Sequence, residues 1–291
     1  MRYATAVLLG ITLLAVTGCQ RPADDPAGPP PASSPAAGGP GLHELTLTSG
    51  GEERDYLLEV PASYQPGEPV PLIVVLHPGN GSARKVRSSS RMAGLAEQQR
   101  VLVAYPEGIN GFWRPKLEGE HGVGVEFGGD PVDVNFLRDL VEHLVAEWGV
   151  ARGQVYAAGH SNGAAMTYRL AAEAGDLFAA IAPVGGYLID PPATIEPTEP
   201  VSVVGFVSMD SEYTGEIMEG LEIWRDRLGC EAGEPAEYPP GDRVTVVEAT
   251  CRDGSEVVEY RIEGMPHVWP KPSHGIDATQ VMWEFFTDHA R

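Results

Sequence analysis

The chain has 291 residues, of which 43% are apolar, and a formal net charge of −21 at pH 7. This length and apolar content suffice for a packed core, in one large domain or two small ones. The negative field of so acidic a chain repels phosphate backbones, which excludes nucleic acid as a partner.

The N-terminus has the pattern of an export signal. Arg2 precedes the apolar stretch AVLLGITLLAV, which is shorter than the roughly 20 residues that span a bilayer. The stretch ends in VTGC, which resembles the lipobox of bacterial lipoproteins. We therefore predict a signal peptide over residues 1–18 and a lipid anchor at Cys19, the first residue of the mature chain. Ordinary secretion without a lipid is the alternative.

A segment rich in proline, alanine and glycine follows, QRPADDPAGPPPASSPAAGGPG. Its prolines lack amide donors and its small side chains bury little area, so it cannot form a stable helix or strand. We interpret residues 19–41 as the lipidated N-terminus and a tether to the membrane, extended by about 3 Å per residue. Residues 42–291 are then a single folded domain.

The domain alternates strand and helix patterns. HELTLTS and RDYLLEV alternate as antiparallel strands do, whereas five short apolar runs are typical of strands in a buried parallel sheet: 71–77, 101–106, 155–159, 179–185 and 201–207. Helical periodicity predicts helices over 85–99, 134–148, 162–174, 215–229 and 277–290. Together these elements predict an α/β fold, a mostly parallel central sheet with helices on both faces.

Ligands of such folds bind beyond the carboxyl ends of the strands. The run 155–159 ends there at Gly159-His160-Ser161-Asn162-Gly163, a G-x-S-x-G motif, and a helix begins at once. A strand before and a helix after this motif make a nucleophile elbow, a strained turn that exposes the serine hydroxyl. Ser161 is therefore the candidate nucleophile, and we interpret His160 as structural.

A serine hydroxyl needs a histidine base, which in turn is oriented by a carboxylate. In this fold the acid and then the histidine follow later strands in that order. Asp210 lies three residues beyond the run 201–207, and His267 follows VVEYRI by five residues. The competing acids are Glu212 and Asp277, and the competing base is His274.

An oxyanion hole is expected from two backbone amides. The amide of Asn162, the residue after the nucleophile, is one donor, and the loop LHPGNGS supplies the other. We choose Gly79 for this second donor, with Asn80 as the fallback, because Pro78 has no N–H to donate.

Cys230 and Cys251 are an even pair in a chain predicted to be exported, which favours a disulfide. Such a bridge closes a loop of about 20 residues and stabilises the fold by roughly 3 kcal/mol. A metal site is the weaker interpretation, because the chain has no CxxC or HExxH spacing.

Several segments together resemble a known family: LHPGNGSA, DVNFLRDLV, VYAAGHSNGAAMTYRLA, GCEAG, EVVEYRIEGMPHVWP and GIDATQVMWEFF. They are similar to the esterases grouped with polyhydroxybutyrate depolymerases and with feruloyl or acetylxylan esterases, nearly continuously over 43–291. The resemblance implies an α/β-hydrolase with a Ser-Asp-His triad that acts on esters outside the cytoplasm. It places His267 in the H-x-W-P segment of the family and pairs Cys230 with Cys251.

The chain departs from the family at two places. The family usually has His-Gly where this chain has His77-Pro78, and His-Gly-Thr where it has Phe206-Val207-Ser208. The first change is harmless if residue 79 is the donor, and the second leaves Asp210 in register.

The sequence thus predicts an exported serine carboxylesterase that needs no cofactor or metal, works through an acyl-enzyme and is anchored in the bacterial cell envelope. Its substrates are expected to be polyhydroxyalkanoate-type, feruloyl or acetyl esters. One alternative is a lipid-anchored binding protein with an impaired triad, for which the changes at Pro78 and Phe206 are the support. Another is a serine peptidase on the same fold.

The segment 107–131 is long, glycine-rich and placed where binding loops lie. Trp113 and Phe127 within it could stack on a sugar or aromatic acyl group, or simply hold the loop in place. The same two interpretations, packing and substrate contact, apply to Trp269, which is close to His267.

Overall fold

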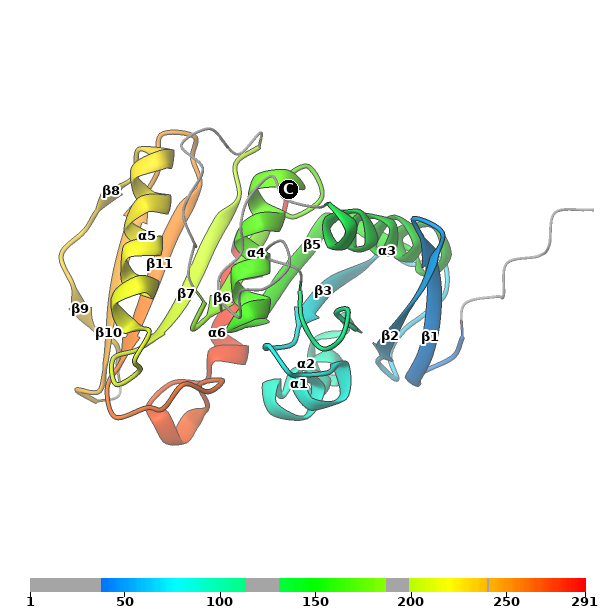
Figure 1. The fold of residues 1–291 in the computed structure, drawn as a ribbon, viewed down its shortest axis with the longest axis horizontal. Helices are drawn as coiled ribbons and strands as arrows, with labels where there is room; N and C mark the ends of the chain where they lie inside the picture. The colour runs from blue at the N-terminus through cyan, green and yellow to red at the C-terminus, as the bar shows by residue number, and fades with distance from the viewer. Residues whose placement is uncertain (1–37, 114–130, 187–198, 240) are drawn as a thin grey trace, which may run out of the picture. The chain divides into compact units, whose positions relative to one another are not determined.

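A computed structural model describes residues 38–113, 131–186, 199–239 and 241–291 of the chain (Figure 1). The predicted signal peptide, Cys19 and most of the tether lie outside the described residues, as does Phe127. Among the described residues, no helix combines the length and the apolar character needed to cross a bilayer.

The strands and helices alternate through most of the described chain. The strands are β1 (Gly41–Ser49), β2 (Glu52–Val60), β3 (Val70–Leu76), β4 (Leu102–Pro106), β5 (Val150–His160), β6 (Ala180–Val184), β7 (Ser202–Ser208), β8 (Glu231–Ala232), β9 (Ala236–Glu237), β10 (Val244–Thr250) and β11 (Glu256–Ile262). The helices are α1 (Ala83–Ser90), α2 (Met92–Gln99), α3 (Val132–Trp148), α4 (Asn162–Glu173), α5 (Thr214–Leu228) and α6 (Ala278–Asp288), with a 3-10 turn at Pro272–His274.

One mixed sheet contains all of these strands, in the order β1-β2-β4-β3-β5-β6-β7-β11-β10-β8, with β9 paired to β10. The strands from β4 through β11 in this order pair in parallel, while β1, β2 and β10 add antiparallel margins. The carboxyl ends of the parallel strands therefore meet at one edge of the sheet. The predicted α/β-hydrolase architecture with a mostly parallel sheet is confirmed.

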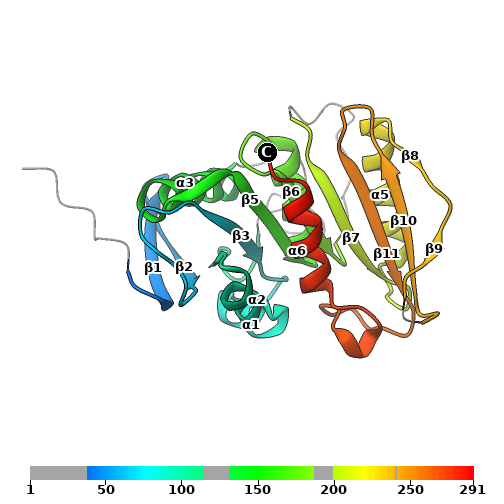
Figure 2. The same ribbon diagram turned by 180° about the vertical axis from the view of Figure 1, so that it is seen from behind.

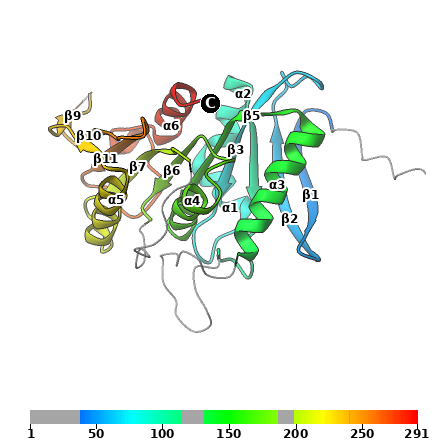
Figure 3. The same ribbon diagram turned by 90° about the horizontal axis from the view of Figure 1, so that it is seen from above.

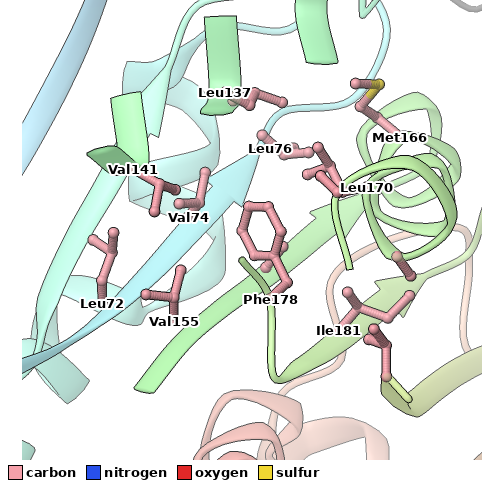
Figure 4. Close-up of a cluster of buried hydrophobic side chains, with 14 of the residues drawn as sticks. Leu72, Val74, Leu76, Leu137, Val141, Val155, Met166, Leu170, Phe178 and Ile181 are labelled. Carbon is pink, nitrogen blue, oxygen red and sulfur yellow. The ribbon is translucent and has the colours of Figure 1, made fainter. Parts of the chain in front are cut away.

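Helices cover both faces of the sheet, as Figures 1 and 2 show from opposite sides and Figure 3 shows from above. Strand β3 contributes to both cores because successive side chains point to opposite faces. Val74 packs on the face covered by α3, α4 and α5, while Ile73 and Val75 pack on the face covered by α1, α2 and α6. Figure 4 shows the first core, which includes Leu72, Val74, Leu76, Leu137, Val141, Val155, Met166, Leu170, Phe178 and Ile181.

The single helix predicted over 85–99 is wrong, because the chain breaks at Arg91 into α1 and α2. Arg91 has φ 61°, a left-handed conformation that cannot continue a helix. Two contacts hold the break: the Ser90 hydroxyl accepts the Met92 N–H at 3.4 Å, and the Arg91 guanidinium pairs with Asp277 at 2.6 Å. Serine side chains compete in this way with helical hydrogen bonds, an effect that apolar periodicity does not reveal.

Cys230 and Cys251 form a disulfide, as predicted. The bridge spans 21 residues of sequence and joins the turn after α5 to the residue that follows β10. It therefore fastens a helix to the antiparallel margin of the sheet.

A buried ion pair ties β2 to the start of α3. The Arg54 guanidinium donates to the Asp133 carboxylate at 2.8 Å and to the Glu107 carbonyl at 3.0 Å. It also lies 4.1 Å from the centre of the Phe136 ring. The Arg54 and Asp133 side chains are 6% and 0% exposed, so water cannot replace either partner. One arginine thus connects the end of β4, the first turn of α3 and the sheet.

We expect Arg54→Met to lower the free energy of unfolding by about 3 kcal/mol, because it removes the arginine that pairs with a buried carboxylate. Equilibrium unfolding in guanidinium chloride measures the change. Arg152→Met is the matched control, since it breaks an exposed pair with Glu142 and should alter stability little. An equal effect of the two substitutions would contradict the role given to Arg54.

Candidate active site

The predicted site residues all follow carboxyl ends of parallel strands. Gly79 comes after β3, Ser161 after β5, Asp210 after β7 and His267 after β11. Since these ends share one edge of the sheet, the chain order of the strands brings distant residues toward one place.

Ser161 occupies the strained turn that the G-x-S-x-G motif predicts. It has φ 55° and ψ −117°, and it immediately precedes α4. Its N–H donates to the Val184 carbonyl at 2.8 Å, and its carbonyl accepts the Ala165 N–H at 3.0 Å. The turn is therefore fixed by β6 on one side and by the first turn of α4 on the other.

The two motif glycines are required by close backbone contacts. A Cβ on Gly159 would lie 2.3 Å from the carbonyl oxygen of Gly163. A Cβ on Gly163 would lie 2.4 Å from the Leu76 carbonyl oxygen and 2.6 Å from that of His77. Helix α4 thus begins in direct contact with the end of β3, which any side chain at these positions would prevent.

His267 lies beside this turn. A Cβ added to Gly185 would come within 2.9 Å of its ring, and Gly185 directly follows the Val184 that binds Ser161. The ring centre is also 5.0 Å from that of His160. Both ring nitrogens of His267 are buried without a hydrogen-bond partner among the described residues. Unpaired buried polar atoms of this kind are uncommon and often have a functional cause.

The surroundings keep both histidines neutral near pH 7. Burial lowers the pKa of His267, and Glu212 partly opposes this shift. Burial, together with His267, lowers the pKa of His160 to about 3. Tyr213 meets the His267 ring edge-on, with 5.4 Å between ring centres. A neutral imidazole can accept a proton.

Asp210 lies on the loop after β7 and is hydrogen-bonded to the loop that carries His267. Its Oδ2 accepts the Gly264 N–H at 2.5 Å, but no hydrogen bond joins it to His267 among the described residues. The carboxylate is exposed. Of the competing residues, Glu212 is the acid that acts on the His267 pKa, while Asp277 pairs with Arg91.

His274, the competing base, lies in the 3-10 turn after β11. Its Nδ1 accepts the Lys271 N–H at 3.4 Å, which ties its ring to its own turn. The predicted base His267, by contrast, packs on Gly185 beside the elbow.

Sequence reasoning missed Ser208 as a residue that supports the site. Its hydroxyl donates to the Met265 carbonyl, two residues before His267, and its own carbonyl accepts the Thr214 hydroxyl at 2.7 Å. A signal for it was present, because Ser208 stands where the family has the threonine of His-Gly-Thr and keeps a hydroxyl there. Phe206, the departure at the first position, is buried and stacks on Tyr260.

Gly79 and Asn162, the predicted oxyanion donors, are neighbours. A Cβ on Gly79 would lie 3.7 Å from the Asn162 Cβ and 2.8 Å from the Phe112 ring. Asn162 is the first residue of α4, where backbone N–H groups have no helical partner. Asn80, the fallback donor, has φ 56° in the same loop.

His77 supports this loop through a neutral ring. Its Nδ1 donates to the Pro78 carbonyl at 2.8 Å and its Nε2 accepts the Gly108 N–H at 2.9 Å. Burial lowers the pKa of His77, which agrees with an uncharged ring that both donates and accepts. Pro78 needs no N–H for these contacts.

The two tryptophans, expected either to contact substrate or to pack, are buried, which favours packing. Trp113 is 0% exposed and its indole N–H donates to the His77 carbonyl at 2.9 Å. Trp269 is 4% exposed and its indole N–H donates to the Thr279 hydroxyl at 3.0 Å. Their rings are used for packing, and neither indole N–H is free for a substrate. Most of the predicted binding loop, 114–130, lies outside the described residues.

Among the residues that the structure describes, no cluster of three or more histidine, cysteine, aspartate or glutamate side chains is arranged to hold a metal ion. The sheet edge carries groups suited to acid–base and nucleophilic chemistry: the strained Ser161, the His267 ring packed on Gly185, and the residues Gly79 and Asn162, which lie close together.

Comparisons with known proteins show the family and the fold of the chain. No protein-family model matches the chain. NocK of Nocardia uniformis subsp. tsuyamanensis, which carries a provisional esterase name, is 31% identical over 269 residues, covering 84% of this chain and 75% of NocK. Feruloyl esterase B of Piromyces equi is 26% identical over 238 residues, which cover 74% of this chain but only 42% of that longer protein.

Among solved structures, the acetyl xylan esterase from Aspergillus awamori matches with a TM-score of 0.66 and 17% identity. The match covers 85% of this chain and 99% of that one. At this identity the likeness shows the fold, while the relationship to NocK extends over most of both sequences. The chain belongs to the α/β-hydrolase family of esterases that includes feruloyl and acetylxylan esterases.

Proposed function

We propose that this chain is a serine esterase in which Ser161, His267 and Asp210 form the catalytic triad. The observation that carries the proposal is the strained Ser161 turn with the His267 ring packed beside it on Gly185. A serine hydroxyl becomes a nucleophile when a base accepts its proton, and a neutral imidazole can serve as that base.

In the first half-reaction, Ser161 Oγ attacks the ester carbonyl carbon while His267 accepts its proton. The bond from this carbon to the alcohol oxygen then breaks, and His267 returns the proton to the departing alcohol. In the second half-reaction, water attacks the acyl-enzyme, His267 again carries the proton, and the carboxylic acid leaves. Asp210 stabilises the imidazolium that forms in each half.

The amides of Gly79 and Asn162 bind the oxyanion of each tetrahedral intermediate. Their neighbouring positions at the ends of β3 and β5 support this assignment. The N-terminus of α4 adds a favourable field for developing negative charge. Each such donor contributes about 3 to 4 kcal/mol to transition-state stabilisation.

The substrates we propose are acetyl or hydroxycinnamoyl esters, on the basis of the names of the acetylxylan and feruloyl esterase relatives. The predicted lipobox at Cys19 and the disulfide support an enzyme that is exported and held at the cell envelope. A panel of acetyl, butyryl, hydroxybutyryl and feruloyl esters, assayed beside peptides, tests the substrate class.

Ser161→Ala should lower kcat/KM for p-nitrophenyl acetate by about 10⁴-fold or more and abolish labelling by a fluorophosphonate probe. The cause is the loss of the nucleophile that both reactions need. Ser88→Ala on α1 removes an exposed hydroxyl and serves as the control that keeps both properties. Unchanged turnover in a folded Ser161→Ala protein would refute the mechanism.

Asp210→Asn should lower kcat by about 10²-fold to 10⁴-fold, since an amide cannot stabilise the imidazolium as a carboxylate does. Glu212→Gln should change kcat little, because Glu212 is exposed and acts on His267 through its charge. Parallel measurements of kcat at saturating ester decide between the two acids. A large loss in Glu212→Gln with none in Asp210→Asn would transfer the role to Glu212.

The pH profile should report the neutral state of His267. Burial lowers its pKa below the ordinary 6.5, so kcat/KM should fall only as pH drops through a midpoint under 6.5. His160, Tyr213 and Glu212 surround the ring, and Glu212 is the group that raises its pKa. Glu212→Gln should therefore move the acid limb to lower pH, and a shift to higher pH would contradict this account.

A further inference from the structure

Trp113 makes three hydrogen bonds that join the two sides of the proposed oxyanion hole. Its main-chain N–H donates to Asn162 Oδ1 at 2.9 Å, and its carbonyl accepts from Asn162 Nδ2 at 3.3 Å. Its indole N–H donates to the His77 carbonyl at 2.9 Å. Trp113, Asn162 and His77 are all 0% exposed, so water cannot substitute for these bonds.

The partners of Trp113 are placed next to the two proposed donors. Asn162 carries one of these donors on its own main chain, and both polar atoms of its side-chain amide are engaged by Trp113. His77 lies two residues before Gly79, the second donor, and its carbonyl oxygen faces the Cα of Gly163. One residue from the loop after β4 therefore connects the end of β3 to the first residue of α4.

A neighbouring contact supports the same arrangement. The Phe112 ring packs against the Cα of Gly79, within 2.8 Å of where a Cβ would stand. Residues 112 and 113 thus touch the loop of one donor and the side chain of the other. A shift of this segment would change the separation between the Gly79 and Asn162 amides.

We propose that Trp113 is a positioning residue for the oxyanion hole: its main chain fixes Asn162 and its indole fixes the strand end that leads to Gly79. This inference rests on the proposed serine esterase function. Trp113 touches no reacting atom and acts only through the spacing of the two donors. Misplacing a catalytic group by about 1 Å can cost about 10²-fold in rate, so a single indole hydrogen bond can affect turnover.

The test is Trp113→Phe, which keeps a buried aromatic ring and removes the indole donor. The rate of p-nitrophenyl acetate hydrolysis is normalised to the fraction of enzyme that a fluorophosphonate labels. This correction excludes poorly folded protein from the measured kcat. We expect kcat per labelled serine to fall about tenfold with KM little changed, since a displaced donor costs less than a lost one. The inhibition constant of phenylboronic acid, whose tetrahedral adduct places an oxygen in the hole, should rise by a similar factor.

Tyr64→Phe is the matched control. It also removes one buried hydrogen bond from a ring to a carbonyl, that of the Tyr64 hydroxyl to Trp148 at 3.0 Å. This bond lies by the amino end of β3, where Gly149 accepts the Val70 N–H, whereas the site lies at the carboxyl end. This variant should lose thermal stability but keep wild-type kcat per labelled serine and wild-type inhibition by phenylboronic acid.

A second test variant is Asn162→Ala. It removes both hydrogen bonds between the Asn162 side chain and the Trp113 main chain, so it should lower kcat and weaken boronate inhibition as Trp113→Phe does.

If Trp113→Phe and Asn162→Ala keep wild-type kcat per labelled serine and wild-type boronate inhibition, Trp113 serves packing alone and the inference is overturned. If the wild-type enzyme is not labelled at Ser161 and Ser161→Ala still hydrolyses the ester, the proposed function itself fails, and this inference with it. The two failures are thus separated by the behaviour of the wild-type protein.

Discussion

Ser161 has φ 55°, a conformation that costs a residue with a side chain about 1 to 3 kcal/mol and persists only where the surrounding structure enforces it. Here the enforcement comes from three parallel strands. The Ser161 N–H binds the end of β6, Gly159 belongs to β5, and Gly163 rests on the carbonyls at the end of β3. The strained turn can form only after these strands have paired in register, so the candidate site depends on the central sheet.

Asp210 and His267 lie on loops, and hydrogen bonds between these loops hold them in place. Ser208, the last residue of β7, and Asp210, two residues later, bind main-chain groups at 265 and 264 on the loop that carries His267. Because β7 and β11 are adjacent and parallel, these two loops leave the sheet side by side. Their mutual bonds place His267 against Gly185, at the end of β6, and its burial there keeps the imidazole neutral.

The sequence was informative where one local pattern determines the structure. Apolar runs predicted the parallel strands, and G-x-S-x-G between a strand and a helix predicted the turn at Ser161. It was uninformative where the outcome depends on a distant partner. The break at Arg91 needs Asp277, and the burial of Trp113 needs the His77 carbonyl and the Asn162 amide. No window of neighbouring residues contains these contacts.

The two departures from the family pattern are accommodated by contacts within the fold. Proline at 78 lacks only an N–H, and the loop uses its carbonyl, which accepts from His77 Nδ1 and from the Gly81 N–H at 2.9 Å. Phe206 replaces a polar residue on a buried strand, where stacking on Tyr260 supplies apolar contact instead. Ser208, within the same altered triplet, keeps the hydroxyl that reaches the His267 loop. Both changes therefore alter side chains, while the Pro78 carbonyl and the Ser208 hydroxyl keep hydrogen bonds to the loops near the proposed site.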